Sequence, residues 1–127
     1  MRETIECVPN FSTSDQKIVK LILREIRKTE NAFLLDYTFD NYYNRLVVSF
    51  VGNKESVLEA ALNSAFAAIE LIDMRGHKGQ HPRIGAVDVV PFIPIKNVTL
   101  GDCIELARRF GQVLAEKCSV PVYLYGE

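Results

Sequence analysis

The sequence predicts an α+β fold, a ferredoxin-like split β-α-β sandwich in which helices cover one face of an antiparallel or mixed sheet. Three observations carry this prediction. Apolar residues at helical spacing alternate with short runs of β-forming residues, in the order β-α-β-β-α-β followed by one more helix and strand. No internal repeat and no linker interrupts this order. The 127 residues, 48% of them hydrophobic, are enough for a single domain spanning 1–127 and too few for two.

The first strand and the first helix are expected near the N-terminus. The strand covers residues 4–8, and Pro9 ends it because proline cannot donate to a sheet. The helix follows, since Ile18, Ile22 and Ile26 recur every four residues and so share one helical face. Its candidate N-terminal caps, all short polar side chains, are Ser12, Ser14 and Asp15.

A hairpin and a second helix come next. Residues 33–37 and 46–51 are rich in β-formers and flank a polar turn at 40–41. The helix opens after Gly52-Asn53 and runs to about residue 73. Its small side chains, which would let it lie close to a sheet, are Ala60, Ala61, Ala65 and Ala68.

The third strand has an unbroken apolar run, Leu46-Val47-Val48, in place of strict alternation. Strands that are buried on both faces have this pattern. We therefore expect a second domain or a second copy to cover the face of the sheet that the helices leave open.

The last third of the chain contains another apolar run at 86–95, which Pro91 and Pro94 limit to an edge strand or a bulge. Thr99 and Asp102 have the spacing of a capping box at the start of a third helix. Residues 120–125 are expected to form a closing strand.

The composition argues against several classes of function. A formal net charge of -1, with acids and bases interleaved, predicts no nucleic-acid partner and no membrane partner. No run approaches the roughly 20 apolar residues of a membrane span, and the first residues do not resemble a signal peptide. The three cysteines lack metal-ligand spacing and cannot all pair, which is typical of a cytoplasmic protein.

The segment 75–85 is the strongest candidate for a functional site. It holds both histidines, three cations and three glycines, and no acid. His81 precedes Pro82, which favours an extended backbone at the histidine. An imidazole with an ordinary pKa of about 6.5 can accept or give a proton near neutral pH. Arg83 can hold a carboxylate through two parallel hydrogen bonds, and Gly85 allows a ligand to approach closely.

One other interpretation of this segment stays open, and a metal site is disfavoured. It can be a solvated connector between a helix and a strand, because glycines and cations are common in loops. His77 and His81 are four residues apart, which would suit a metal only on a helix. Gly79 and Pro82 argue against a helix and no third ligand is evident, so no metal is expected.

Five polar residues outside this segment are further candidates. Asp88 interrupts an apolar run, so we expect a buried carboxylate that is paired within the fold or faces a site. Arg45, next to Asn44 at the start of the third strand, is either an edge charge or an anion-binding fork. Asn10 is either a turn residue or a ligand contact. Asp36 either orients a histidine or caps a turn.

Several blocks of sequence resemble the amino-terminal subdomain of glutamate formimidoyltransferase. The most specific are Cys-Val-Pro-Asn-Phe-Ser at 7–12 and Gly-Gln-His-Pro-Arg-Ile-Gly at 79–85, and the resemblance covers nearly the whole chain. Further matching segments lie at 34–36, 44–45, 50–52, 67–73 and 121–127. The resemblance implies transfer of a formimino group from N-formimino-glutamate to tetrahydrofolate in histidine breakdown, a ferredoxin-like fold and a homodimer.

The resemblance also implies roles for particular residues. The family's catalytic histidine falls on His81, which would act as acid and base. Arg45 and Arg83 would then hold carboxylates of glutamate or of the folate tail. The remaining expected contacts are Asn10, Asn44 and Gly85 with substrate, and Asp36, Gln80 and Asp88 in support. We expect no metal. We also expect a second, C-terminal subdomain to be absent from this chain, which leaves two alternatives: that subdomain is encoded separately, or this chain is a fragment of a longer one.

The sequence departs from the family pattern at three places. Thr38 and Gln80 stand where the family has acids, and Thr13-Ser14 replace an acid and a glycine. A neutral Gln80 would not raise the pKa of the neighbouring His81 as a glutamate could. The alternatives are therefore a non-catalytic folate- or glutamate-binding module and a dimerising structural protein.

Overall fold

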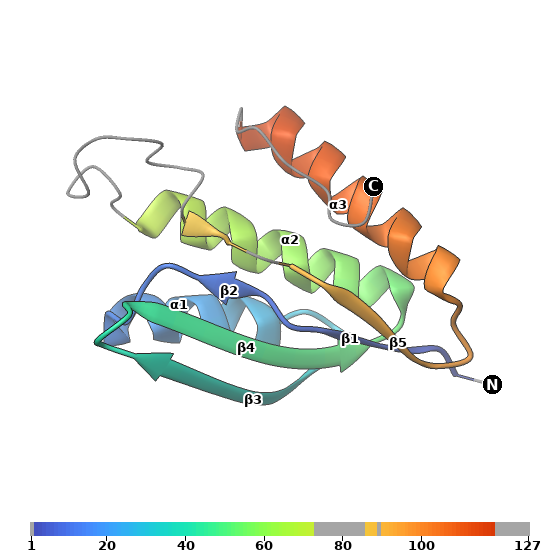
Figure 1. Cartoon of the computed structure of the whole chain (residues 1–127), viewed down its shortest axis with the longest axis horizontal. Coiled ribbons are helices and arrows are strands. Elements are labelled where there is room, and N and C mark those ends of the chain that lie inside the picture. Colours follow the sequence, from blue (N-terminus) through green and yellow to red (C-terminus); the bar gives the residue numbers. More distant parts are fainter. Residues whose placement is uncertain (1, 73–85, 89, 119–127) are drawn as a thin grey trace.

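The computed structural model describes residues 2–72, 86–88 and 90–118 (Figure 1). The elements follow the predicted order, with one additional short strand. They are β1 (Thr4–Cys7), β2 (Asn10–Phe11), α1 (Gln16–Arg27), β3 (Ala32–Asp40), β4 (Arg45–Gly52), α2 (Lys54–Leu71), β5 (Phe92–Lys96) and α3 (Leu100–Cys118). The closing strand predicted at 120–125 lies outside the described residues.

The described strands form a single antiparallel sheet. β4 pairs with β3 on one side and with β1 and β2 on the other, while β5 pairs with the far side of β1. β1 and β2 thus run one after the other beside β4, so the sheet is four strands wide in the order β3, β4, β1, β5. This order and the helices between the strands confirm the ferredoxin-like fold class. Of the two sheet types left open, antiparallel or mixed, the described strands form the antiparallel one.

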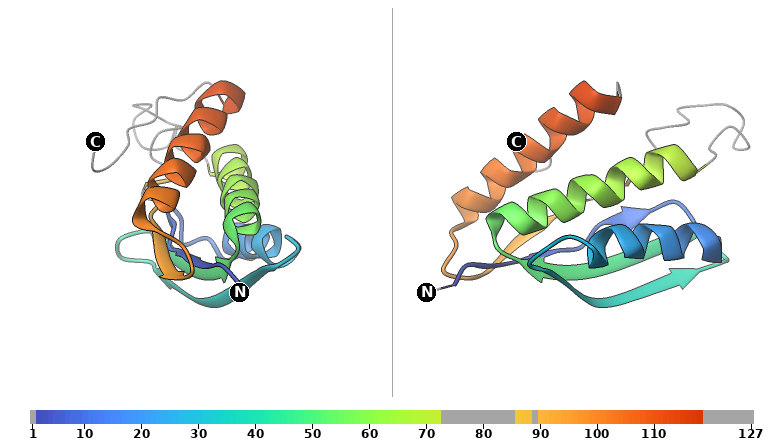
Figure 2. Two further views of the ribbon diagram at one scale, coloured as in Figure 1. Left: turned by 90° about the vertical axis from the view of Figure 1, so that its right-hand side faces the viewer. Right: turned by 180° about the vertical axis from the view of Figure 1, so that it is seen from behind.

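The hydrophobic core lies between the sheet and the helices, which occupy one face of it (Figures 1 and 2). Leu46, Val48 and Phe50 of β4 point into this layer and are 0% exposed. Val47 and Val51, which alternate with them, are only partly buried. The predicted burial on both faces is therefore incomplete, and no described element covers the second face. We call the face opposite the helices the open face.

Helices α1 and α2 bury the faces that their spacing predicts. In α1 the buried side chains include Ile22 and Ile26, while Leu21 points outward. All four small residues of α2 that were predicted to lie near the sheet are buried: Ala60, Ala61, Ala65 and Ala68. α3 packs beside α2 and against β5, where Phe110 meets Phe92 edge to face at 6.0 Å between ring centroids.

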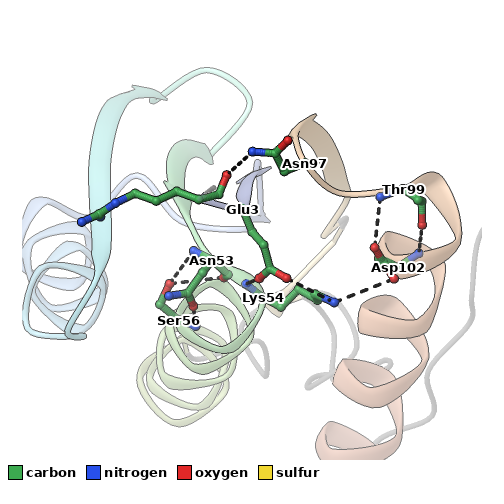
Figure 3. Close-up of polar contacts among 8 residues, drawn as sticks. Glu3, Asn53, Lys54, Ser56, Asn97, Thr99 and Asp102 are labelled. Carbon is green, nitrogen blue, oxygen red and sulfur yellow. Dashed lines mark hydrogen bonds and ion pairs between the residues drawn. The ribbon is translucent and has the colours of Figure 1, made fainter.

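Capping side chains fix where the helices begin. Of the three candidates for α1, Asp15 is the cap, and its Oδ1 accepts the backbone N–H groups of Lys17 and Ile18. The predicted box at Thr99 and Asp102 is confirmed, because each side chain accepts the other residue's backbone N–H at 3.0 Å (Figure 3). The hydrogen bond from Thr99 lowers the pKa of Asp102.

Replacing Gly52 by alanine should destabilise the fold. A Cβ at Gly52 would collide with Ser56 Oγ and would lie 2.6 Å from the carbonyl oxygen of Asn31, which is backbone and cannot turn aside. We expect the free energy of unfolding in urea to fall by about 1–3 kcal/mol, as for other overpacked sites.

The matched control for this substitution is Gly101→Ala in the first turn of α3. Its Cβ would meet only Thr99 Oγ1, at 3.6 Å. Alanine is a better helix former than glycine, so the free energy of unfolding should be unchanged or rise by up to about 1 kcal/mol. If both variants lose the same free energy of unfolding, the contact with the Asn31 carbonyl is not the reason that position 52 requires glycine.

Candidate functional site

Strand register places Asn10, Val47 and Thr38 in one row on the open face. Val47 lies opposite Thr38 on β3 and opposite Asn10 on β2. Residues opposite one another in a sheet point to the same face, and Val47 points away from the helices. In the next row Arg45 lies opposite Asp40. The open face at this end of the sheet therefore presents an arginine, a threonine, an amide and a carboxylate.

A hollow of about 810 Å³ occupies the same place. The polar residues around it are Thr38, Asp40, Asn41 and Arg45. The apolar ones are Phe39, Tyr43 and Val47. A hollow that combines an apolar floor with a single guanidinium suits a ligand that carries both a carboxylate and an aromatic or aliphatic body.

Arg45 is held loosely. Its Nη2 lies 3.8 Å from Asp88 Oδ2, and both side chains are about half exposed, at 53% and 50%. An ion pair of this length at the surface contributes little to stability. The guanidinium therefore has donors available for a ligand carboxylate.

Asp88 reaches Arg45 because residues 86–88 run alongside β2. Its backbone N–H donates to the Asn10 carbonyl at 2.9 Å, and the Ser12 N–H donates to the Ala86 carbonyl at 3.0 Å. The expectation that Asp88 is buried is wrong, since the residue is exposed. The segment pairs at the edge of the sheet, where a polar side chain can face solvent although its neighbours in the sequence are apolar.

The side chains of the other described candidates already form hydrogen bonds within the protein. Asn44 has a left-handed backbone (φ 54°), and its Oδ1 accepts both the N–H and the Oγ–H of Ser14 at 2.9 Å. Asn10 Nδ2 donates to the Val8 carbonyl at 3.3 Å. Asp36 lies within β3 beside a register shift, and its Oδ1 accepts the Tyr37 N–H at 2.8 Å, so its carboxylate is bonded to its own strand. The structure thus brings together Asn10, Arg45 and Asp88, and Asn44 directly precedes Arg45 in the sequence.

Five candidate residues lie outside the described part of the chain. They are His81, Gln80, Arg83 and Gly85, together with His77. The first described residue after this segment is Ala86, which is bonded to Ser12 and precedes Asp88 by two positions. The chain therefore re-enters the described fold directly beside Asn10 and Arg45.

Two features of the open face differ from the predictions or were not predicted. Asp40 was assigned to a turn, yet it lines the hollow beside Arg45. Glu6 accepts a 2.6 Å hydrogen bond from Ser49 Oγ across the sheet. The alternation of Ile5, Glu6 and Cys7 could have shown that Glu6 points away from the core, but its partner depends on register.

The buried cysteines Cys7 and Cys103 are unsuited to act as nucleophiles. Cys7 and Cys103 are free and buried. Burial raises the pKa of the Cys7 thiol well above its ordinary value, and it raises the pKa of Cys103 as well. Within the described residues, no group of three or more histidine, cysteine or acidic side chains is arranged to hold a metal, and no helix is long and apolar enough to span a membrane.

Comparison with known proteins identifies the family. The family described as "Formiminotransferase domain, N-terminal subdomain" matches residues 4–127. The chain belongs to this family. It is 51% identical over 128 residues to the formimidoyltransferase-cyclodeaminase of Sus scrofa, covering 100% of this chain and 24% of that protein. It is 41% identical over 124 residues to the glutamate formimidoyltransferase of Thermoplasma acidophilum, covering 97% of this chain and 41% of that protein.

A third relative has the same name as the Thermoplasma acidophilum protein. The glutamate formimidoyltransferase of Streptococcus pyogenes is 37% identical over 126 residues, which cover 98% of this chain and 42% of that protein. The chain therefore spans less than half the length of each of these relatives.

Proposed function

We propose that this formiminotransferase subdomain supplies the proton carrier and the carboxylate-binding arginine of a glutamate formimidoyltransferase. The donor is N-formimino-glutamate and the acceptor is tetrahydrofolate, as in histidine breakdown. Membership of the family over residues 4–127 is the observation that carries the proposal. The arginine-bearing hollow on the open face, next to the point where the chain emerges from the His81 segment, supports it.

The reaction moves one carbon between two nitrogens. The folate amine attacks the carbon of the protonated formimino group, which gives a tetrahedral intermediate with its positive charge on the attacking nitrogen. His81 takes the proton from that nitrogen and delivers it to the glutamate nitrogen. The bond between the carbon and the glutamate nitrogen then breaks, so glutamate leaves as a neutral amine and the formimino group stays on the folate. Such proton transfer contributes typically 10²–10⁴-fold to rate.

Other residues of this chain position the substrates. Arg45 binds a carboxylate in the hollow by exchanging the loose contact with Asp88 for two hydrogen bonds to the ligand. Asn10 and Asn44 flank that carboxylate, and Arg83 binds a second one. Gly85 lets the backbone approach the ligand, while Asp36 and Gln80 act in support.

The open face is the proposed contact with the rest of the transferase. Phe33, Val47 and Ile93 point to that face without cover from the described residues. The relatives are more than twice as long as the matched segment, so they contain further chain that can cover it. A second subdomain there would exclude water and hold both substrates in place. We assign the protein to the cytoplasm, where free thiols such as Cys7 and Cys103 stay reduced.

A second candidate function is a folate- or glutamate-binding module without turnover. The observation that favours it is the neutral Thr38 in the hollow, which leaves Asp40 as its one carboxylate among the described lining residues. The module and the transferase share the carboxylate contact at Arg45. They differ in whether His81 moves a proton.

The binding half of the proposal can be tested with Arg45→Ala. The host is a hybrid in which this chain replaces the matching 128-residue segment of the Sus scrofa relative. Loss of charged hydrogen bonds worth about 1.5–3 kcal/mol should weaken N-formimino-glutamate binding roughly 10- to 100-fold in calorimetric titration. Arg108→Ala is the matched control, because Arg108 also makes a half-exposed ion pair, at 3.7 Å to Glu105, and lies on α3. Equal affinities for the two variants would refute the role of Arg45.

A further inference from the structure

The turn between β3 and β4 brings two opposite charges to the hollow on the open face. Asp40 is the last residue of β3 and lies opposite Arg45, the first residue of β4. Residues opposite one another in an antiparallel pair share a face and have Cβ atoms about 4.5–5.5 Å apart. Both residues line the hollow. A carboxylate and a guanidinium therefore stand side by side there.

These two charges do not neutralise each other. Arg45 makes its 3.8 Å contact with Asp88, which lies beyond β2 and so on the side of β4 away from β3. Within residues 2–72, 86–88 and 90–118, Asp40 forms no ion pair with Arg45 or with any other base. The hollow therefore offers both charges to a ligand that carries one group of each sign.

A hydrogen bond holds Asp40 in place without using its charge. Its Oδ1 accepts the backbone N–H of Tyr42, two residues further on, at 2.8 Å. This local bond is typical of an aspartate or asparagine at a turn, and it fixes the carboxylate at the mouth of the hairpin. An ionised carboxylate can accept about four hydrogen bonds, so most of its capacity is left for a ligand. The turn needs only an acceptor oxygen, which a neutral asparagine would also provide.

The formimino donor of the proposed reaction carries matching charges. Its formimino group is an amidine, which is a strong base and is therefore protonated near neutral pH. The resulting amidinium is attached at the α-carbon, so its positive charge lies next to the α-carboxylate. A planar amidinium can donate two parallel N–H groups to a carboxylate, as a guanidinium does. One ligand can thus place its α-carboxylate on Arg45 and its amidinium on Asp40.

We propose that Asp40 binds the charged formimino group and makes the hollow specific for N-formimino-glutamate. This inference rests on the proposed function and adds a specificity-determining residue to it. A carboxylate beside the amidinium stabilises its charged form, which is the form that the folate amine attacks. A glutamate that carries a neutral acyl group on the same nitrogen gains no such contact and leaves Asp40 without a cationic partner. Such compounds should bind more weakly.

NMR titration of the isotope-labelled full chain with two ligands tests the proposal. N-formyl-glutamate has the skeleton of N-formimino-glutamate, with a neutral oxygen in place of the charged nitrogen. The unmodified chain should bind the formimino compound roughly 10-fold more tightly, the usual effect of one charged hydrogen bond at an exposed site. Asp40→Asn keeps an acceptor for the Tyr42 N–H and removes the charge. The two dissociation constants of this variant should agree within about twofold.

The matched control is Glu30→Gln, which removes one negative charge elsewhere on the molecule. Glu30 is exposed and lies just before β3, at the end of that strand opposite Asp40 and roughly 25 Å from it. This variant should keep the full preference for the formimino compound, because the preference comes from a local contact and not from net charge. Thermal unfolding at the temperature of the unmodified chain checks that both variants are folded.

The inference is overturned if the unmodified chain binds both ligands equally or binds neither. It is also overturned if Asp40→Asn keeps the preference for the formimino compound. Titration of Arg45→Ala separates this inference from the proposed function. If Arg45→Ala weakens both ligands while Asp40→Asn keeps the preference, only the role of Asp40 is refuted. If Arg45→Ala changes neither dissociation constant, the carboxylate contact of the proposed function is refuted too.

Discussion

Replacing His81 by alanine is expected to lower kcat of the hybrid transferase by about 10²–10⁴-fold, the usual contribution of a general acid–base group. The change removes the group that we propose carries the proton from the folate amine to the glutamate nitrogen. Because alanine leaves the carboxylate contacts in place, KM for N-formimino-glutamate should change little. Steady-state kinetics with both substrates measures the two constants separately.

The chain offers a matched control for this variant, since it has only one other histidine, His77. His77→Ala removes the same side chain from the same segment and should leave kcat within about threefold, because no proton transfer is assigned to it. Both variants should unfold at the temperature of the unmodified hybrid. If His81→Ala turns over at the unmodified rate, the assignment of His81 as proton carrier is lost.

Replacing Phe50 by alanine is expected to lower the free energy of unfolding by about 3–5 kcal/mol, the range for large core aromatics. Phe50 is 0% exposed at the centre of β4, where it lies opposite Cys7 of β1 and Leu34 of β3. The cavity would lie beneath α1 and α2 and could not fill without moving a central strand. Urea unfolding of the isolated chain measures the loss.

Phe33→Ala tests the same substitution on the other face of the sheet. Phe33 lies opposite Val51 and is 60% exposed. Its truncation should change the free energy of unfolding by no more than about 0.5 kcal/mol, as for other surface positions. A loss at Phe33 as large as that at Phe50 would contradict the assignment of an open face.

Local patterns were sufficient for much of the fold. The four-residue spacing of Ile18, Ile22 and Ile26 placed the buried face of α1, and Thr99 with Asp102 placed the start of α3. β2 was missed because Pro9 ends β1. The chain nevertheless continues beside β4, where the Pro9 carbonyl accepts the Val48 N–H. A proline removes a donor but keeps its acceptor, which sequence pattern alone does not use.

The candidate site was harder to predict because it depends on register. Thr38 and Asn10 are far apart in sequence and meet in one row only through Val47. The register shift between Leu34 and Asp36 decides which β3 residues reach the open face, and it has no clear signal in the sequence. Arg45 could be chosen from its charge at the start of a strand. Its contact with Asp88 could not, because residues 86–88 pair with β2 across a long sequence separation.

The central claim is that this chain takes part in group transfer, and the fate of the formimino carbon tests it most directly. N-formimino-glutamate with an isotope-labelled formimino carbon would be incubated with tetrahydrofolate and the hybrid transferase, and the label followed by NMR. The account predicts that the label moves to the folate amine, that free glutamate appears in equal amount, and that His81→Ala abolishes both changes. If the label stays on glutamate while the unmodified Sus scrofa relative transfers it under the same conditions, the transferase account is contradicted.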